Sequence, residues 1–320
     1  MLGTFRLLLA ILVALSHVNF RIEGLNPGVI AVVCFYLISG YVMTGLIRRH
    51  YFSWSAIPAF YLDRAMRLLP QYYLLLALVL CWFFVSGNTN SFLQHSPSFL
   101  DWFFNLSIVP LNYFMFNHSD QFTAIPPAWS LGAEIQFYIL FPIILLCRAR
   151  WLTLVIALAV FVSASVGLLH TDYFGYRLLP GVLTFFVLGS FLFDLQETKV
   201  QLKKYSILML FFVAVFAYAL YASAHLDLPY NRETLLGLAV GITLLALLGN
   251  KAQRQWDNRL GDLSYGVFLN HFLIQWVSGR VPTTFSEMTI YIALSLFLSF
   301  LTQALIERPV LIWRKKLRTS

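Results

Sequence analysis

Charge is scarce in this chain of 320 residues, of which only 11% are Asp, Glu, Lys or Arg, whereas 59% are hydrophobic and 30 are Phe. Soluble domains carry about 25% charged residues, so this scarcity excludes an ordinary soluble fold. The mean hydropathy of +0.74 instead indicates a chain that crosses the bilayer several times.

Cysteine is also rare. Cys34, Cys81 and Cys147 lie in apolar runs without paired spacing, so neither a disulfide framework nor a zinc site is indicated. The histidines in loops show no metal-ligand spacing, and no glycine-rich phosphate-binding loop is present. We therefore expect no metal and no permanently bound cofactor.

Long apolar runs are what the chain has in abundance. Allowing for polar residues that face a bundle interior, we predict about ten transmembrane helices in one domain, residues 1–320, and an all-α polytopic bundle. The first apolar run lacks a small-residue cleavage site, so we interpret it as a retained helix rather than a signal peptide. The ten segments are residues 4–20, 28–47, 68–86, 131–147, 151–169, 178–195, 205–223, 234–249, 262–278 and 288–307.

The distribution of basic residues predicts the orientation. Apart from Arg6, 17 of the 21 other Lys and Arg residues fall in the loops 48–67, 148–150, 194–204 and 250–261 and in the tail from Arg308. Because basic residues are retained on the cytoplasmic side, both termini are predicted to be cytoplasmic. The net charge of +8 then reflects topology, and no nucleic-acid partner is expected.

The connection between the third and fourth predicted spans, residues 87–130, is the longest in the chain and contains no Lys or Arg. It is predicted to be extracytoplasmic. Within it, the apolar stretch 99–116 is interrupted by Asp101, Asn105, Pro110 and Asn112, which indicates an interfacial or re-entrant segment. Long ordered loops often carry function, so this one could cover an acceptor site.

Two ionisable residues lie inside the first apolar run. Arg6 and His17 are eleven residues apart, which on a helix places them about 20° apart around the axis and about 16 Å apart along it. The predicted orientation puts Arg6 at the cytoplasmic end and His17 in the outer half. Because such groups are costly in a membrane, a functional role is the first interpretation.

Glu134 lies in the segment PPAWSLGAEIQFYILFP, residues 126–142, about one turn inside the outer boundary of the fourth span. Its depth is close to that of His17, so the carboxylate and the imidazole could meet and fix the histidine tautomer. The alternative is that Glu134 pairs with a cation and only stabilises the bundle.

On the cytoplasmic side, Arg64 and Arg67 are three residues apart and would share a face of a helix. Two guanidinium groups so placed suit a phosphate or pyrophosphate, although ordinary retention of basic residues explains them equally well. Glu307 could form a salt bridge with one of them. Ser39, Asn270 and His271 could line a passage through the bundle, with helix packing as the alternative.

Several motifs, in their order along the chain, resemble those of the acyltransferase-3 family of integral-membrane enzymes. They span nearly the whole chain, and their joint order is far more specific than any one of them. The motifs are Arg6 with His17, GVIAVVCFYLISGYVM at residues 28–43, Arg64-Ala-Met-Arg67, WSLGAEIQFYILFP at residues 129–142, LGDLSYGVFLNHFLI at residues 260–274, and Ile306-Glu307-Arg308-Pro309.

The resemblance implies roles for individual residues. His17 corresponds to the family's essential histidine and Arg6 to its partner arginine, whereas Arg64 and Arg67 fall on the paired arginines that engage the acyl donor. We assign all three arginines to binding of the donor, whose thioester arm would pass Arg6 on its way to His17. Glu134 falls on the glutamate of the tryptophan-serine-leucine motif. The chain ends at Ser320 without the extracytoplasmic hydrolase-like domain of some relatives, so we expect transfer to be completed in the membrane domain or with a separate partner.

The resulting hypothesis is a membrane O-acyltransferase of the bacterial inner membrane. It would move an acyl group, most often acetyl, from cytoplasmic acetyl-CoA as co-substrate to a hydroxyl of an envelope glycan or lipid-linked saccharide. His17 would act as the general base or would itself relay the acyl group. The alternative from another class is a transporter or flippase in which Arg6, His17 and Glu134 form an ion or proton pathway. Acceptor, acyl length and oligomeric state are left open.

Overall fold

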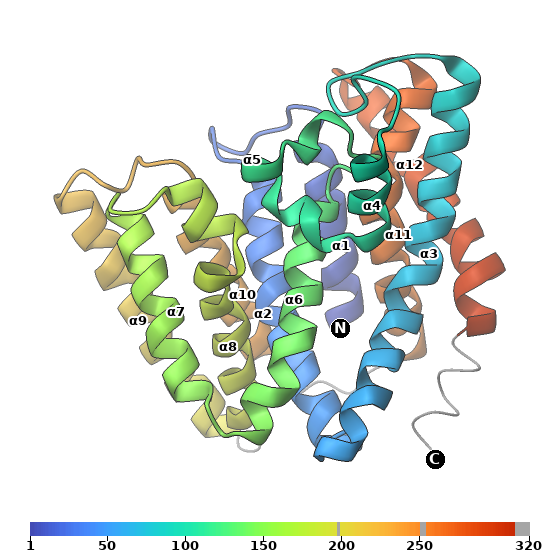
Figure 1. Ribbon diagram of the computed structural model, residues 1–320. Coiled ribbons are helices and arrows are strands. Elements are labelled where there is room, and N and C mark those ends of the chain that lie inside the picture. Colours follow the sequence, from blue (N-terminus) through green and yellow to red (C-terminus); the bar gives the residue numbers. More distant parts are fainter. Residues whose placement is uncertain (197–198, 250–253, 311–320) are drawn as a thin grey trace.

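The structure, a computed structural model, describes residues 1–196, 199–249 and 254–310, and within these ranges every regular element is a helix (Figure 1). Parts of the predicted cytoplasmic loops 194–204 and 250–261, and the tail after residue 310, lie outside the described residues. The long helices are α1 (Leu2–Ser16), α2 (Pro27–His50), α3 (Ile57–Ser86), α6 (Ala128–Leu146), α7 (Arg150–Ser165), α8 (Leu179–Leu195), α9 (Lys199–Ala222), α10 (Asn231–Leu248), α11 (Gln255–Ser278) and α12 (Phe285–Thr302). The shorter ones are η1 (Trp54–Ala56), α4 (Phe99–Ser107), η2 (Val109–Tyr113), α5 (Phe114–Asn117), η3 (Ser119–Gln121), η4 (Thr171–Arg177) and η5 (Gln303–Glu307).

The all-helical, multi-pass class predicted from the sequence is confirmed. Seven helical segments in the described ranges are long and apolar enough to cross a membrane. Two more predicted spans fall on the shorter apolar helices α1 and α7, and one falls on α11, so a total of about ten and the cytoplasmic termini stay predictions. The seven segments are Pro27–His50, Trp54–Ser86, Ala128–Leu146, Thr171–Leu195, Gln201–Ala222, Asn231–Leu248 and Phe285–Val310.

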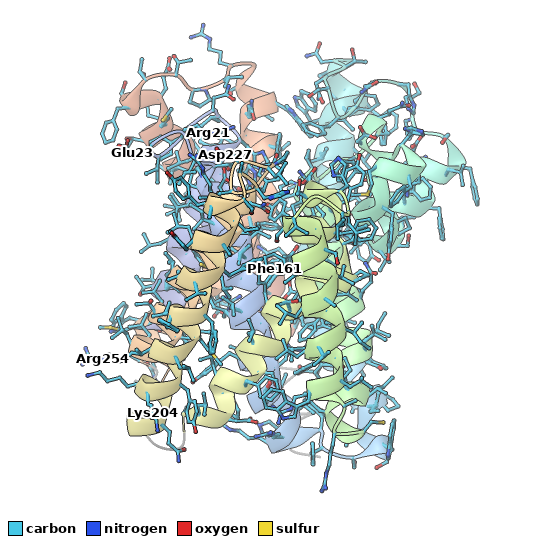
Figure 2. The ribbon with its side chains drawn as sticks, turned by 90° about the vertical axis from the view of Figure 1, so that its left-hand side faces the viewer. Arg21, Glu23, Phe161, Lys204, Asp227 and Arg254 are labelled. Atoms are coloured by element: carbon cyan, nitrogen blue, oxygen red, sulfur yellow. The ribbon has the colours of Figure 1, made fainter. Side chains whose placement is uncertain are left out.

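The helices form two groups on either side of a central layer. In Figure 1, α7, α8, α9 and α10 lie on one side, α3, α11 and α12 lie on the other, and α1, α2 and α6 stand between them. Figure 2 shows Lys204 and Arg254 towards the lower end and Arg21, Glu23 and Asp227 towards the upper end, with the apolar Phe161 between. Charged side chains therefore gather at the two ends, as expected where the middle faces lipid.

Helix α1 packs closely against α11 because glycines meet at the crossing. A Cβ atom on Gly3 would lie 1.8 Å from the carbonyl oxygen of Asp257, and one on Gly261 would lie 2.8 Å from the Cα atom of Gly3. Close approach of backbones at small residues is the usual way in which membrane helices associate. This contact fixes the helix that carries both Arg6 and His17.

The same crossing supplies the cap of α1. The carboxylate of Asp257 accepts hydrogen bonds from the backbone amides of Gly3 and Thr4, at 3.1 and 2.9 Å, and pairs with the amino group of Met1 at 2.8 Å. Burial opposes ionisation of Asp257, but the Met1 ammonium and the hydrogen bonds from Thr4 and Gly3 outweigh it and hold the pKa of this carboxyl well below its usual range. Figure 1 shows the N-terminus above the lower ends of α2 and α3, so α1 begins inside the bundle.

Helix α2 is the central helix of the bundle, and it begins where Asn26 caps Gly28 through a 3.0 Å hydrogen bond and Pro27 occupies the first turn. It packs against α8 at two glycines, since a Cβ atom on Gly40 would lie 1.8 Å from the carbonyl oxygen of Phe186 and one on Gly189 would lie 2.0 Å from that of Leu37. Ser39 and Tyr41 are the sequence neighbours of Gly40, and their side chains remain free to bond to residues outside this contact.

The long connection 87–130 is folded into short helices rather than one span. A capping box of Ser98 and Asp101 begins α4, whose apolar residues Phe99 and Phe103 are 84% and 52% exposed. Asn105 ties the segment together, because its side chain donates to the carbonyl of Phe122 and accepts from an amide two residues later. The exposed apolar face agrees with an interfacial location, which stays a prediction.

Candidate active site

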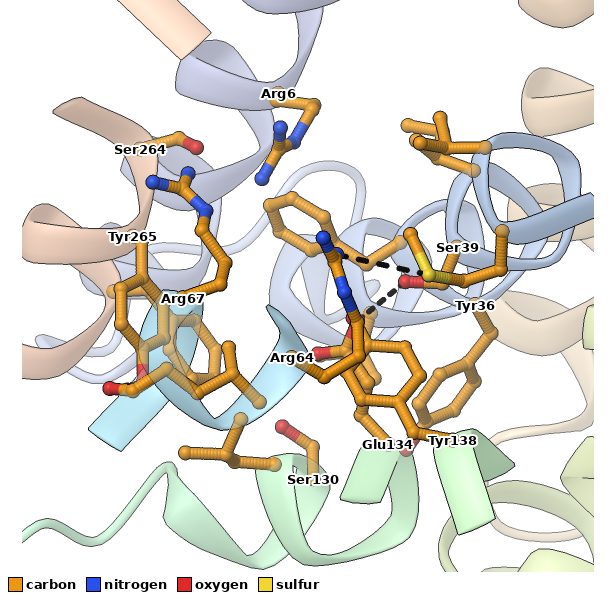
Figure 3. A pocket seen from close by; sticks show the side chains of 18 residues that line it. Arg6, Tyr36, Ser39, Arg64, Arg67, Ser130, Glu134, Tyr138, Ser264 and Tyr265 are labelled. Carbon is orange, nitrogen blue, oxygen red and sulfur yellow. Dashed lines mark hydrogen bonds between the residues drawn. The ribbon is translucent and has the colours of Figure 1, made fainter. Parts of the chain in front are cut away.

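A cavity of about 130 Å³ lies among α1, α2, α3, α6 and α11 (Figure 3). It is named the inner cavity because the predicted orientation places it nearer the cytoplasm, and the words inner and outer refer to that predicted orientation from here on. Since one water needs about 10–15 Å³ measured in this way, the cavity has room for several waters or a short acyl group. It collects the three arginines that the sequence analysis assigned to the acyl donor. Its polar lining residues are Arg6, Ser39, Arg64, Arg67, Ser130, Glu134, Tyr138, Ser264 and Tyr265.

The three arginines differ in their partners. Arg64, buried on α3, is hydrogen-bonded to Asp63 and lies 3.7 Å from the sulfur of Met43. Arg67 forms an ion pair with Glu307, as anticipated, and a longer one of 3.6 Å with Asp262. No ion pair or side-chain hydrogen bond joins Arg6 to a residue in the described ranges, and Figure 3 shows its guanidinium pointing towards the cavity. Arg6 is therefore the cation best placed to meet an incoming anion.

Glu134 is held by hydroxyl groups. The Oγ of Ser39 and the phenolic oxygen of Tyr138 both donate to its Oε1, each at 2.5 Å. None of the ion pairs within the described ranges involves Glu134, which disfavours the interpretation of this residue as a simple salt-bridge partner. Ser39 thus lies at the wall of the inner cavity, and its role in a passage stays a prediction.

An outer cavity of about 150 Å³ contains His17. His17 follows the last residue of α1, and its ring stacks on that of His271, with centroids 5.3 Å apart, and packs against Phe272 at 4.8 Å. Nδ1 of His271 donates to the carbonyl of Val267 at 3.0 Å, because a carbonyl only accepts, and Nε2 has no hydrogen-bond partner in the described part of the chain. The ring of His271 therefore supports the ring of His17 by stacking against it.

Arg177 is the charged residue that faces His17 across the outer cavity. Its Nε donates to Asp172 at 2.6 Å, and its guanidinium carbon lies 4.6 Å from the ring of Trp129 and 5.2 Å from that of Tyr176. The η4 turn places it there, at the outer start of α8. Aromatic rings and a fixed cation are suited to stacking on a saccharide and to bonding with its oxygens.

Three residues line both cavities and form the partition between them: Val32 of α2, Ser130 of α6 and Phe268 of α11. One layer of side chains thus separates the arginine-lined space from the space that contains His17. The partition is where a group passing from one cavity to the other has to cross.

The structure does not bring His17 and Glu134 together. They line different cavities, and Glu134 is occupied by Ser39 and Tyr138 while His17 packs on His271. Similar depth is not enough for contact, because the two side chains face different sides of the partition. Asn270 also differs from the prediction, since its side chain is fully buried and is bonded to Ser295 of α12 at 2.9 and 2.5 Å, which is a packing role.

Sequence reasoning missed several lining residues, chiefly Tyr138, Trp129, Tyr176, Phe268 and Arg177. For Arg177 a signal was present, because it is one of the few basic residues on the predicted outer side and directly precedes a span. The aromatic residues gave none in a chain with so many. In the described ranges, no group of three or more His, Cys, Asp or Glu residues could hold a metal ion.

Comparison with known proteins identifies the family. A model of the acyltransferase domain matches residues 2–304, nearly the whole chain. The chain belongs to this acyltransferase family. It is therefore a multi-pass membrane acyltransferase, which favours acyl transfer over the transporter alternative.

Individual relatives are similar over parts of their length. The chain is 38% identical to an uncharacterized protein of Aquifex aeolicus over 194 residues, which are 58% of this chain and 88% of that relative. It is 30% identical to putative O-acetyltransferases of Staphylococcus aureus over 42% of this chain and 22% of theirs. It is 22% identical to the peptidoglycan O-acetyltransferase OatA of Listeria monocytogenes over 84% of this chain.

The chain spans about half of the Listeria relative, 48% of its length, and less of the staphylococcal ones. No solved structure matches it. The family membership thus fixes the reaction class of the membrane domain, while donor, acceptor and residue roles belong to the proposal that follows.

Proposed function

We propose that this acyltransferase moves an acetyl group from cytoplasmic acetyl-CoA to a hydroxyl of an envelope glycan or lipid-linked saccharide at the bacterial inner membrane. The observation that supports it is the pair of cavities: one lined by Arg6, Arg64 and Arg67, the other by His17 among aromatic residues, with one layer of side chains between them.

The inner cavity suits the donor. Coenzyme A carries phosphate groups and a thioester at the end of a long arm, and arginines bind phosphates through planar, bidentate donation. Arg64 and Arg67 already have carboxylate neighbours, so an incoming phosphate would compete with these, whereas Arg6 is open to it. The thioester would lie deeper, near the partition.

The outer cavity suits the acceptor. A saccharide would stack on Trp129 and Tyr176, and its hydroxyl would approach His17. His17 takes the hydroxyl proton as the oxygen forms its bond with the acyl carbon, which raises the nucleophilicity of that oxygen. His271, stacked on His17, keeps the imidazole from turning away. His17 is therefore the base of the acceptor step.

The test uses the purified protein in lipid nanodiscs with labelled acetyl-CoA and a membrane-glycan extract. We expect His17→Ala to lower acetyl transfer by about 100-fold or more, the usual contribution of a general base, with unchanged thermal unfolding. The matched control is His225→Ala, because His225 lies in the loop between α9 and α10 and its ring bonds to the hydroxyl of Ser223. Transfer by His17→Ala at the wild-type rate would refute this role.

A further inference from the structure

The inner cavity contains a hydroxyl and a carboxylate arranged as a nucleophile and its base. Ser39 donates to Glu134, and Tyr138 donates to the same carboxylate oxygen, both at 2.5 Å. A nucleophile within hydrogen-bond reach of a base, with a third group that orients the base, is the arrangement used in covalent catalysis. Figure 3 shows Ser39 and Glu134 joined at the cavity wall, beside Arg64.

Ser39 is one of two serine or threonine hydroxyls in the described helices that donate to a carboxylate on another helix, and the other, Thr4, bonds to Asp257 and lines neither cavity. Hydroxyls inside membrane helices usually donate back to a carbonyl about one turn earlier, as Thr44 does to Gly40 at 2.7 Å and Ser264 does to Gly261 at 2.6 Å. Ser39 instead donates to a carboxylate on another helix, 95 residues away in sequence. Its proton is therefore directed at a group that can accept it.

Glu134 is suited to take that proton. Its carboxylate accepts hydrogen bonds from two neutral hydroxyls and forms no direct ion pair within the described residues, so the proton of Ser39 has no contacting guanidinium to compete with for this oxygen. The carboxylate also lines the cavity, and the protonated form could pass the proton on to a leaving group there.

The location of Ser39 suits a residue that holds the acyl group between the donor and the acceptor. It is the thirteenth of the 24 residues of α2, about 18 Å from the outer end of that helix, hence near the middle of the bilayer. On α6, the partition residue Ser130 lies four residues outward of Glu134, about one turn or 6 Å. An acyl group held at Ser39 is thus on the donor side, about one turn from the partition.

We propose that Ser39 carries the acyl group as an ester between the two half-reactions, a proposal that rests on the proposed acyl-CoA donor. In the first step, Oγ of Ser39 attacks the thioester carbonyl and its proton moves to Glu134. The carbon–sulfur bond breaks, and the coenzyme A thiolate leaves with the proton from Glu134. The products are the Ser39 ester and free coenzyme A.

In the second step, the acceptor hydroxyl approaches from the outer cavity and attacks the Ser39 ester. His17 takes the acceptor's proton and passes it to the oxygen of Ser39 as the carbon–oxygen bond breaks, so His17 is neutral again at the end of the step. The acetylated acceptor is released outwards, and Ser39 and Glu134 return to their starting state. The acyl group and one proton pass the partition in opposite directions, and the arm of coenzyme A does not have to pass it.

The experiment is acid-quench mass spectrometry of the nanodisc-embedded protein after mixing with labelled acetyl-CoA and no acceptor. We expect an added mass of about 42 Da, the difference between an acetyl ester and a hydroxyl, on the peptide that contains Ser39. His17→Ala should retain or increase this adduct, because only the acceptor step is blocked. Glu134→Gln should form it about 100-fold more slowly.

Variants of Ser39 test whether the adduct is attached to this residue. Ser39→Ala should lack it, whereas Ser165→Ala is the matched control, because Ser165 is a buried helical serine that bonds to its own helix and lines neither cavity. Ser39→Cys should carry a thioester that neutral hydroxylamine removes, while the wild-type oxygen ester resists it. Thermal unfolding of each variant shows whether it is folded.

The outcomes separate the two proposals. Three results would each overturn the serine intermediate and leave the proposed function intact. The first is coenzyme A release and acetyl transfer by the wild type without an adduct on Ser39. The others are an adduct on Tyr138 instead, and full transfer by folded Ser39→Ala. If the folded wild-type protein neither releases coenzyme A nor transfers acetyl, both proposals are overturned.

Discussion

Phe268 is the largest of the three side chains that the two cavities share. It extends from α11, is 8% exposed, and packs edge to face on Phe35 of α2 with centroids 6.3 Å apart. Val32 and Ser130, the other two residues of the partition, are smaller. The ring of Phe268 therefore limits the cross-section of whatever passes between the cavities, and an acetyl group, the smallest common acyl group, is what such a limit favours.

At this scale we predict that Phe268→Ala widens the range of acyl groups transferred. The ratio of propionyl to acetyl transfer, measured with equal concentrations of the two coenzyme A esters, should rise by about 10-fold, since one methylene in a pocket contributes about 1–3 kcal/mol to discrimination. Phe161→Ala is the matched control, because Phe161 is a buried phenylalanine that lines neither cavity and packs on Phe185 and Phe216. An unchanged ratio in an active Phe268→Ala enzyme would show that the partition does not select acyl size.

Individual residues could be found from the sequence where their chemistry is costly in a membrane. Arg6, His17 and Glu134 stood out for that reason, and the structure places all three at cavity walls. Phe268 could not be found, because it is one of 30 phenylalanines and nothing in its own chemistry marks it. The partner of Glu134 was missed as well, since a serine in an apolar helix most often bonds to its own backbone.

The crossing of α1 and α11 is the element-scale feature on which the position of His17 depends. Both Arg6 and His17 are carried by α1, and His271 is carried by α11, so a shift between these helices would alter both cavities at once. The crossing has no space for a side chain at Gly3, as the 1.8 Å distance from a Cβ atom to the Asp257 carbonyl shows.

Gly3→Ala should therefore destabilise the protein by about 1–3 kcal/mol, the usual cost of inserting atoms into a packed contact. We expect a lower midpoint of thermal unfolding in detergent together with reduced acyl transfer. Gly175→Ala is the matched control, because a Cβ atom there would meet that of Ala164 at 3.7 Å, an ordinary contact. Equal unfolding midpoints for the two variants would contradict the close approach of α1 and α11.

Asp257 adds a dependence on pH at the same crossing. Its pKa is lower in the folded protein than in the unfolded chain, so the ionised carboxylate stabilises the fold at neutral pH, and this contribution is lost as the pH falls below the unfolded value of about 3.9. Asp257→Asn should lower stability at neutral pH by about 1–2 kcal/mol. The difference from wild type should narrow below about pH 4.

Unfolding midpoints of wild type and Asp257→Asn, measured across the acid range, check this prediction. Asp120→Asn serves as the control, since Asp120 is an exposed residue of the outer connection. A difference from wild type that stays constant down to the acid limit would mean that the carboxylate charge of Asp257 does not stabilise the start of α1.

The sequence predicted which segments are helices better than where they begin and end. The first span was placed at residues 4–20, but α1 ends at Ser16, where the amide of His17 closes a tighter turn on the carbonyl of Ala14 and the positive φ of Asn19 then ends the helical path. The third span was started at residue 68, whereas α3 begins at Ile57 and includes Arg64 and Arg67. Hydropathy detects the part of a helix that meets lipid, and not a polar extension that lines a cavity.

At the scale of the whole molecule, the order of the helices could be predicted but their packing could not. Small residues such as Gly40 and Gly189, which let α2 and α8 meet, are far apart in sequence. Nothing in the sequence of either helix indicates which helix it packs against. The existence of two cavities is a property of that packing, so it was not accessible before the helices were placed together.

The orientation of the bundle gives the last prediction. In a background in which Cys34, Cys81 and Cys147 are replaced by serine, a cysteine at Asn88, in the long connection, should react with a membrane-impermeant maleimide added to intact cells. A cysteine at Ser53, between α2 and η1, should react only after the cells are permeabilised. The reverse pattern would show that the charge bias was misinterpreted and that the arginine-lined cavity faces outwards.

The thin partition also determines how the membrane potential acts on the reaction. Where water enters a protein from both sides, the potential falls mainly across the layer that separates the two water-filled spaces, and moving one elementary charge through it involves about 2.3 kcal/mol per 100 mV. In the two-step route through Ser39, the acetyl group crosses the partition outwards while the acceptor's proton crosses inwards to the oxygen of Ser39, so the exchange moves no net charge. Acyl transfer through this protein would then be electrically silent, and its rate would be independent of whether the membrane is energised.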